Sequence, residues 1–230
     1  IPPSTITAIN AAKANGHEIV IATGRAYFMM YSITEIIPLI NHFILINGQH
    51  IIANNEVVYE DTIKVTKMEE ITKALKALNI TYGFQSAYSE AISGIDSKII
   101  DTFKELALNI PPQNPSFYNE EKVYQMWCFC TPKEADILRG KFPDFDFIKW
   151  MSSGYDIIKK GQSKGKALIT LANHLGFDLE DTISIGDGDN DIEMNKLAGI
   201  GIAMGNATQN LKNASDYTTD VIGENGVYNA

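Results

Sequence analysis

The sequence has few positive charges, few cysteines and no long apolar run. Its 19 lysine and arginine residues are outnumbered by 28 aspartate and glutamate residues, for a net charge of −9. This balance argues against a surface that binds nucleic acid or an anionic membrane. No apolar run approaches the roughly 18 residues of a membrane-spanning helix, and the first residues lack the pattern of a signal peptide. We therefore predict a cytoplasmic protein without a nucleic-acid or membrane partner.

The cysteine and histidine content argues against a disulfide framework or a zinc site. Cys128 and Cys130 are the two cysteines, and in a strand both point to one face but are poorly placed to bridge each other. With no second cysteine pair or nearby histidine, we interpret them as half-buried strand residues. The four histidines show no ligand spacing, and we assign them no role.

The length of the sequence allows a substantial core. With 230 residues, 45% of them hydrophobic, the chain can form one large domain or two small ones. Its first residue is Ile1 rather than methionine, so we expect this sequence to belong to a longer or processed protein.

The first 62 residues have the pattern of an α/β fold. Residues 4–14 have apolar side chains at helical spacing. Two short apolar segments follow, at residues 17–25 and 42–60, and their continuous apolar character is typical of strands buried on both faces. The pair Asn54-Asn55 predicts a hairpin within the second segment.

Residues 63–156 have a different texture. Amphipathic strand patterns alternate there with helical patterns, which predicts an open antiparallel sheet with helices on one face, as a separate α+β module. The predicted helices span residues 67–79, 98–108 and 132–141, and the predicted strands span residues 81–88, 122–130, 145–152 and 155–160.

From residue 164 the α/β pattern returns. A helical pattern at 164–175 precedes alternating strand and helix patterns up to residue 219, which predicts a parallel sheet covered on both faces. We therefore predict an α/β fold whose doubly wound parallel-sheet core is split in sequence by an inserted α+β domain. The predicted core domain comprises residues 1–62 and 157–230, and the inserted domain comprises residues 63–156.

Two loops of unusual composition follow strands of the predicted core sheet. Thr23 and Gly24 follow one strand, and Asp187 follows another. Because ligands bind outside the carboxyl ends of the strands in such sheets, we expect both loops at one edge of the same sheet. A hydroxyl and an approachable backbone N–H suit a phosphate oxygen, although a plain strand-to-helix turn explains the first loop equally well.

The second loop is unusually acidic, since it holds Asp187, Asp189, Asp191 and Glu193. An EF-hand calcium loop is excluded, because its sixth position is Ile192 instead of glycine and its twelfth is Ala198 instead of glutamate. The positive partial charge at a helix N-terminus would favour an acidic residue at Asp191 or Glu193. It does not explain Asp187. A Mg²⁺ site built from few protein oxygens and a substrate phosphate accounts better for Asp187.

A lysine stands at the start of the predicted helix at 164–175. The surrounding segment, GQSKGKAL, imitates a P-loop but lacks its glycine spacing and its Ser/Thr, so we exclude an ATP site there. At a helix start, the Lys164 ammonium suits a phosphate oxygen or a carboxylate nucleophile. A solvated helix lysine is the alternative, and that description fits Lys166 well.

Five motifs in this order resemble those of the haloacid dehalogenase-like hydrolases: IATGR, INGQHI, GQSKGKAL, GDGDNDIEM, and IAMGNATQNLKNASDYTTD followed by ENGV. More narrowly, the chain is similar to the Cof-type phosphatases, in which a large α+β cap of type IIB is inserted in the core. The resemblance covers the core on both sides of the insertion. It implies a Rossmann-like (HAD-like) core with a cap domain that supplies specificity contacts.

The same resemblance implies a function. Family members hydrolyse phosphate monoesters of small metabolites, such as sugar phosphates, in a Mg²⁺-dependent reaction through an aspartyl-phosphate. The metal and a lysine balance the negative charge that would repel an attacking carboxylate. The implied roles are phosphate binding for Thr23, Gly24 and Asn190, phosphate and nucleophile binding for Lys164, metal ligation for Asp187 with Asp191 as a supporting acid, and a place facing cap and substrate for Asn47 and Gly48.

One motif of the family is missing here. Members begin with a strand that ends in D-x-D-G-T, whose first aspartate is the nucleophile and whose second is the acid/base, and the sequence contains no such motif. Because that strand is the centre of the family's sheet, we expect it in residues that precede Ile1 in a longer protein.

Two other functions are open at this stage. A scaffold that has Thr23, Lys164 and Asp187 but no nucleophile would bind Mg²⁺ and a phosphorylated metabolite without catalysis. A phosphotransferase of the same superfamily, such as a sugar phosphomutase, would pass the phosphoryl group to an acceptor. The sequence leaves the substrate and the oligomeric state undetermined.

Overall fold

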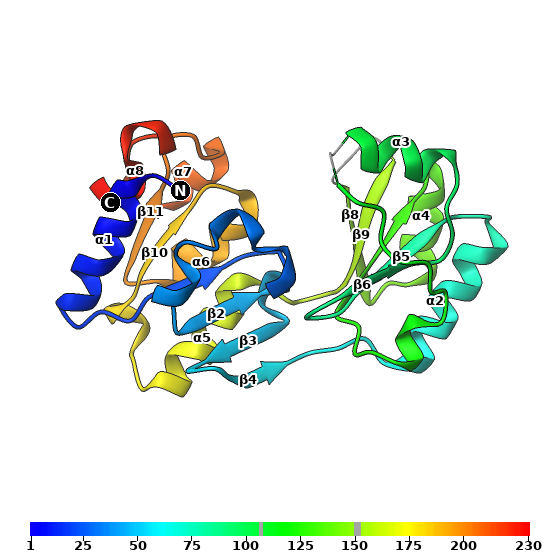
Figure 1. Ribbon diagram of the computed structural model, residues 1–230, viewed down its shortest axis with the longest axis horizontal. Helices are drawn as coiled ribbons and strands as arrows, with labels where there is room; N and C mark the ends of the chain where they lie inside the picture. The colour runs from blue at the N-terminus through cyan, green and yellow to red at the C-terminus, as the bar shows by residue number, and fades with distance from the viewer. Residues whose placement is uncertain (106–107, 150–152) are drawn as a thin grey trace. The chain divides into compact units, whose positions relative to one another are not determined.

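The chain forms two compact units. The computed structural model describes residues 1–105, 108–149 and 153–230 (Figure 1). One unit, here called the core unit, comprises residues 1–60 and 162–230, and the other, the inserted unit, comprises residues 61–161. The sequence patterns placed these borders after residues 62 and 156.

The first part of the core unit contains a helix and a four-stranded sheet. Helix α1 (Pro3–Ala14) precedes strands β1 (Val20–Ala22), β2 (His42–Leu45), β3 (His50–Ala53) and β4 (Glu56–Glu60), which are arranged in this order. Strands β1 and β2 are parallel, and the other two pairs are antiparallel. Asn54 and Asn55 join β3 to β4 with φ values of 51° and 67°. Two consecutive positive φ values match a tight hairpin turn, so the predicted hairpin is confirmed.

This sheet is covered on both faces, as its apolar strands predict. On one face, Ile44 and Ile51 pack against Ala167 and Leu171 of α5 (Lys164–Leu175). On the other face, the ring of Tyr27 lies edge-on to Phe43, with 5.5 Å between the ring centroids. Tyr27 belongs to a segment of short 3₁₀ turns, Tyr27–Met29, Tyr31–Ile33 and Ile37–Leu39.

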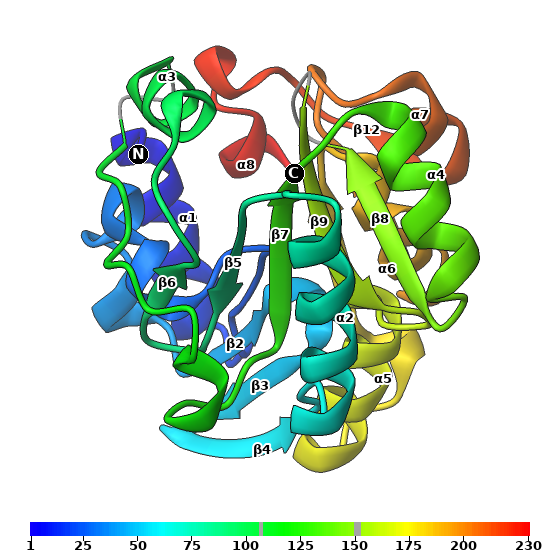
Figure 2. The ribbon, with the colours of Figure 1, turned by 90° about the vertical axis from the view of Figure 1, so that its right-hand side faces the viewer.

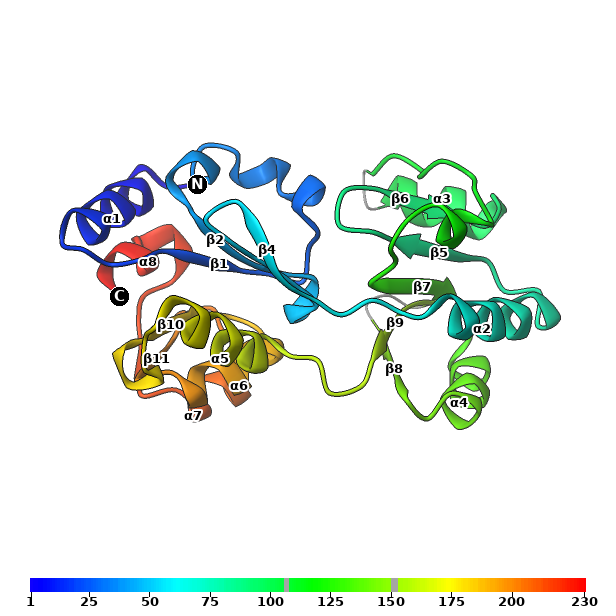
Figure 3. The same cartoon turned by 90° about the horizontal axis from the view of Figure 1, so that it is seen from below.

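The second part of the core unit has alternating helices and parallel strands (Figure 3). After α5 come β10 (Ile183–Gly186), α6 (Ile192–Leu197), β11 (Ile200–Ala203), α7 (Gln209–Ala214), β12 (Tyr217–Thr218) and α8 (Gly226–Asn229). The three strands pair in parallel in the order β10-β11-β12, which confirms the predicted βαβαβ pattern. Within the three described ranges, none of the helices has the length and apolar character needed to cross a membrane.

The core therefore has the predicted α/β class, but its sheet comes in two pieces. β1 belongs to the four-stranded sheet and β10 to the three-stranded one, and no strand among the described residues pairs with the free edge of either. We predicted that the loops after β1 and β10 lie at one edge of the same sheet. For the described residues this prediction is wrong, because β1 and β10 belong to two different sheets. The apolar side chains of β10 are also exposed to solvent, since Ile183 is 59% exposed and Ile185 37% exposed. A parallel strand of this kind is normally covered on both faces.

The inserted unit is an antiparallel sheet with three helices. Its strands are β5 (Tyr82–Gln85), β6 (Glu90–Ile92), β7 (Gln125–Phe129), β8 (Phe145–Lys149) and β9 (Gly154–Lys159), in the order β6-β5-β7-β9-β8. Its helices are α2 (Val65–Ala77), α3 (Ser97–Glu105) and α4 (Pro132–Lys141). The antiparallel sheet is confirmed. The predicted helix at 98–108 and strand at 145–152 extend into residues 106–107 and 150–152, which lie outside the described residues.

The helices of this unit cover both faces of the sheet, so the predicted one-sided arrangement is wrong. Helices α2 and α4 pack on the face that carries Phe84 and Met126 (Figure 2). Helix α3 packs on the opposite face, where Ile99 and Phe103 meet Trp127. The reason is that alternate residues of β7 are apolar on both sides, so both faces need a cover.

The two cysteines are more buried than expected. Cys128 and Cys130 have 0% and 1% of their surface exposed, and their Sγ atoms lie 3.8 Å apart as free thiols. Both point to the face under α4, where they belong to the main apolar cluster of the inserted unit. The half-buried position predicted from the strand pattern is therefore wrong, because a helix covers this face.

Two glycines of the inserted unit should respond to alanine with opposite signs. A Cβ at Gly83 would lie 2.0 Å from the ring of Trp127, which is itself packed against Phe103 and Phe129. We expect Gly83→Ala to lower the free energy of unfolding by about 2–3 kcal/mol, because the ring cannot move without disturbing this cluster. Urea-induced unfolding of the full-length protein measures the change.

Gly140 provides the matched control. It lies near the end of α4, and a Cβ there would meet no atom within 4 Å. We expect Gly140→Ala to raise the free energy of unfolding by about 0.5 kcal/mol, since alanine restricts the unfolded chain more than glycine does. Equal effects of the two substitutions would contradict the close packing of Trp127 on Gly83.

Candidate active site

The loop after β10 is folded around one of its own carboxylates. Asp191 Oδ2 accepts hydrogen bonds from the backbone N–H groups of Asp187 and Gly188, each at 3.0 Å. Gly186 makes this possible, because a Cβ there would lie 2.5 Å from Asp191 Cβ. The loop therefore has a fixed backbone at the carboxyl end of β10.

The other oxygen of the same carboxylate holds the lysine at the start of α5. Lys164 Nζ lies 2.6 Å from Asp191 Oδ1, and only 8% and 5% of the two side chains are exposed. Ser163 caps the helix, since its Oγ accepts a hydrogen bond from the backbone N–H of Lys166 at 3.1 Å. Because a buried charge requires a partner, this ion pair fixes the lysine against the acidic loop.

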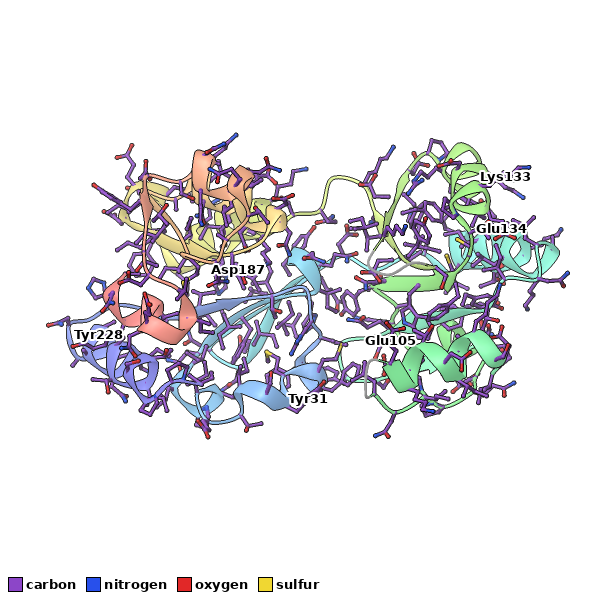
Figure 4. All side chains as sticks on the ribbon, turned by 90° about the horizontal axis from the view of Figure 1, so that it is seen from above. Tyr31, Glu105, Lys133, Glu134, Asp187 and Tyr228 are labelled. Atoms are coloured by element: carbon purple, nitrogen blue, oxygen red, sulfur yellow. The ribbon has the colours of Figure 1, made fainter. Side chains whose placement is uncertain are left out.

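Asp187 itself is held only through its backbone. Its N–H bonds to Asp191, and its carbonyl oxygen accepts a hydrogen bond from the N–H of Thr208 at 3.1 Å. Its side chain is exposed at the end of β10 (Figure 4). The Asp187 carboxylate has no hydrogen bond or ion pair to any residue that the structure describes. It is therefore available to a ligand.

The loop after β1 presents a hydroxyl and a glycine. Thr23 donates its backbone N–H to the carbonyl of Ile44 at 2.8 Å, and its Oγ1 accepts a hydrogen bond from the N–H of Arg25 at 3.1 Å. The hydroxyl proton of Thr23 is thus left to donate to another group. The guanidinium of Arg25 donates to Ser32 Oγ at 3.2 Å, within its own segment.

The loop after β2 connects these two parts of the site. Asn47 donates its backbone N–H to the carbonyl of Thr23 at 3.1 Å, and its Oδ1 accepts a hydrogen bond from Asn190 Nδ2 at 3.2 Å. A Cβ at Gly24 would lie 3.1 Å from the side-chain amide of Asn47. The Asn47–Asn190 bond therefore joins the loops that follow strands of the two separate sheets.

This loop has an unusual backbone. Ile46, Asn47 and Gly48 have φ values of 52°, 53° and 96°. For the β-branched Ile46 such a conformation is a strained one, and strain of this kind collects at functional sites. Gly48 is buried, and a Cβ there would lie 2.5 Å from the carbonyl oxygen of Ser163. Gly48 thus allows the loop to approach the N-terminus of α5.

The structure brings the sequence-predicted residues together in two connected groups within the core unit. Thr23 and Gly24 lie with Asn47, while Lys164 and Asp187 lie with Asp191. The groups join where Asn190 precedes Asp191 in the chain. Gly48 packs against the helix start that carries Lys164.

Two residues of this neighbourhood lie in the fifth sequence motif but were assigned no role from the sequence. Thr208 and Asn210 donate from their side chains to Asp189, at 2.6 Å and 3.5 Å. Because they lie about twenty positions after the acidic loop, spacing along the chain did not connect them with it. The available signal was their place just after β11, which pairs in parallel with β10 and so ends at the same edge of its sheet.

The comparison with protein families decides the assignment. A model of the haloacid dehalogenase-like hydrolases matches residues 1–230. The chain belongs to this family.

Similar proteins include two phosphatases and a hypothetical protein of known structure. The solved structure of a hypothetical protein from Geobacillus kaustophilus is similar with a TM-score of 0.95 and 30% identity, covering 99% of this chain and 89% of that one. The sugar phosphatase BT4131, of subclass IIB of this family, is similar with a TM-score of 0.83 and 32% identity over the same shares. The phosphatase YwpJ of Bacillus subtilis is 28% identical in an alignment 257 residues long, which covers 96% of this chain and 88% of the relative.

Haloacid dehalogenase-like phosphatases generally use a metal ion, and the donors at this site suit a hard cation. Asp187 offers carboxylate oxygens, the ligands that Mg²⁺ prefers. Both oxygens of Asp191 are engaged, one by Lys164 and the other by the loop N–H groups, so Asp191 supports the loop that carries Asp187. No group of three or more His, Cys, Asp or Glu side chains that could hold a metal lies among residues 1–105, 108–149 and 153–230. The Asp187 carboxylate, which has no partner among the described residues, therefore fits a hard cation as one ligand.

Proposed function

We propose that the protein is a Mg²⁺-dependent phosphatase that hydrolyses phosphate monoesters of small metabolites through an aspartyl-phosphate. The observation that carries this proposal is the buried Lys164–Asp191 ion pair beside the unengaged carboxylate of Asp187. The fixed ammonium of Lys164 can bind a phosphoryl group, and the free carboxylate of Asp187 can hold a metal ion. Together they would neutralise the negative charge of that group. The phosphatase names of the relatives support the same reaction.

Each residue has a proposed role. Asp187, with Asp191 in support, would hold Mg²⁺, which neutralises phosphate charge when bound. Lys164 contacts the phosphate and the attacking carboxylate and lowers their mutual repulsion. The Thr23 hydroxyl, the Gly24 N–H and the Asn190 amide donate to phosphate oxygens. Asn47 orients Asn190 through their hydrogen bond, and Gly48 permits the loop to reach α5.

We further propose that the nucleophilic aspartate comes from a strand that lies between β1 and β10. Both strands have an edge that no strand among the described residues covers, and Ile183 and Ile185 are exposed beside one of them. A parallel strand there would pair with both edges and end beside Asp187. Its carboxylate oxygen would attack phosphorus as the ester oxygen leaves, and water would then cleave the acyl phosphate to release inorganic phosphate.

The inserted unit, residues 61–161, is proposed to act as the cap that confers substrate specificity. An inserted domain of this kind serves as a lid and supplies contacts to the part of the substrate that leaves. The substrate is proposed to be a small phosphorylated metabolite. A cytoplasmic location also stays a prediction of the sequence.

The test is phosphate release by the full-length protein from a generic aryl phosphate. We expect inorganic phosphate to be released with Mg²⁺, to stop when EDTA removes the metal, and to return with excess Mg²⁺. Release without any acceptor distinguishes a phosphatase from a phosphomutase. Binding of Mg²⁺ and phosphate without turnover would contradict the proposal and leave a binding protein.

A further inference from the structure

The segment between β11 and α7 reaches back to the acidic loop through Thr208. The backbone N–H of Thr208 donates to the carbonyl oxygen of Asp187 at 3.1 Å. Its Oγ1 donates to Asp189 Oδ1 at 2.6 Å, and the side chain of Asn210 donates to the other oxygen of Asp189 at 3.5 Å. Thr208 thus contacts the acidic loop at both Asp187 and Asp189.

The Thr208 hydroxyl has a fixed orientation. It caps α7 by accepting a hydrogen bond from the backbone N–H of Leu211 at 3.3 Å. Because a hydroxyl has a single proton, the oxygen that accepts from Leu211 uses that proton for Asp189. A hydrogen bond from a hydroxyl to a carboxylate at this distance is of the strong, charge-assisted kind.

The effect on Asp187 is that both of its backbone groups are held. Its N–H bonds to Asp191 and its C=O to Thr208, while its carboxylate has no partner among the residues that the structure describes. The neighbouring carboxylate of Asp189 is at the same time engaged by its own donors. Without them, Asp189 would be free to turn toward Asp187, and two carboxylates near one another repel.

We infer that Thr208 is a positioning residue for the metal site: it fixes the backbone of Asp187 and keeps Asp189 away from it, so that Asp187 is preorganised for a divalent cation. This inference rests on the proposed function, because it assigns Asp187 to the metal. Residues that orient a metal ligand typically change metal affinity by 10- to 100-fold when they are substituted.

The test compares Mg²⁺ binding of two variants of the full-length protein, measured by calorimetric titration with Mg²⁺ alone. Thr208→Val keeps the branched shape and the backbone N–H but loses the hydroxyl, and we expect its Kd for Mg²⁺ to rise about tenfold or more. Thr208→Ser restores the hydroxyl and should bind Mg²⁺ as the wild type does. The Mg²⁺ concentration for half-maximal activity should follow the same order.

Thr131 is a matched control for the loss of a helix cap. In the inserted unit it caps α4, accepting from the N–H of Glu134 at 3.3 Å and donating to its carboxylate at 2.8 Å. Thr131→Val therefore removes nearly the same pair of hydrogen bonds, at a cost of about 1 kcal/mol in stability. We expect it to lower the melting temperature as Thr208→Val does and to leave the Kd for Mg²⁺ unchanged.

The outcomes separate this inference from the proposed function. If the wild type binds Mg²⁺ and Thr208→Val binds it equally well, Thr208 is only a helix cap and the inference fails alone. If the wild type neither binds Mg²⁺ nor releases phosphate, the proposed function fails, and the inference with it. Should Thr208→Val not fold, Asp189→Ala removes the carboxylate that Thr208 restrains and leaves the α7 cap intact. We expect its Kd for Mg²⁺ not to rise, and a tenfold rise there would overturn the inference.

Discussion

Asp187→Asn is expected to abolish Mg²⁺-dependent phosphate release, with a loss in kcat of about a thousandfold or more. The substitution keeps the size of the side chain and the backbone bonds to Asp191 and Thr208. It removes the exposed carboxylate at the end of β10, which no protein donor engages within the described residues. A metal ion supplies several kcal/mol of charge stabilisation, and each 1.36 kcal/mol corresponds to about tenfold in rate.

The measurement is the initial rate with an aryl phosphate over a range of Mg²⁺ concentrations. Because the Asp187 side chain makes no hydrogen bond or ion pair that the structure describes, we expect the melting temperature to stay close to that of the wild type. Asp178→Asn is the control, since Asp178 is an exposed aspartate of the same unit just before β10. Retained activity in Asp187→Asn would remove this residue from the proposed metal site.

Lys164→Met is expected to lower both activity and stability. Its ammonium is buried and lies 2.6 Å from Asp191, so its removal leaves the carboxylate of Asp191 buried without a counter-charge. Breaking a buried ion pair in this way costs about 3–5 kcal/mol. We also expect kcat to fall about 10²- to 10³-fold, since one fixed charge at the phosphoryl group is lost.

A double variant separates the two effects. Lys164→Met with Asp191→Asn removes both charges but keeps a side-chain oxygen to accept the loop N–H groups. We expect it to recover much of the stability, measured by urea-induced unfolding, and none of the activity. Lys166→Met, an exposed position two residues along α5, serves as the control. A single Lys164→Met variant with wild-type stability would show that the buried pair does not hold the loop.

The local elements of the fold were predictable because their signals are local. The helix at 164–175 has the predicted bounds, since Ser163 caps its start and Gly176 ends it in the left-handed conformation with φ of 78°. The hairpin at Asn54-Asn55 followed in the same way from two residues that tolerate positive φ. Neither prediction needed knowledge of distant contacts.

The arrangement of these elements was less predictable, because it depends on which surfaces need a cover. The pattern of β7 placed Trp127 and Met126 on opposite faces but did not say that α3 would cover one of them. In the core, periodicity identified β1 and β10 as buried parallel strands, but it did not show that the described residues leave an edge of each unpaired.

The candidate site was predictable at the level of loops and not at the level of hydrogen bonds. The rule for strand ends indicated that Thr23 and Asp187 belong to one region. The sequence did not show that Asp191 uses one oxygen for Lys164 and the other for the N–H groups of its own loop. Nor did it show the strained backbone of Ile46, because that conformation is imposed by contacts and is not favoured by isoleucine itself.

The division of the core unit in sequence has a consequence for how the chain acquires its structure. The inserted unit is one continuous stretch, residues 61–161, whose contacts can form as soon as that stretch has been synthesised. The contact between Asn47 and Asn190 can form only after the whole stretch between them has been synthesised. The chain entropy that is lost when so long a loop closes disfavours this contact. Contacts of high sequence separation form slowly. We therefore expect the inserted unit to acquire its fold while the two halves of the active site are still apart, with assembly of the site as the late event.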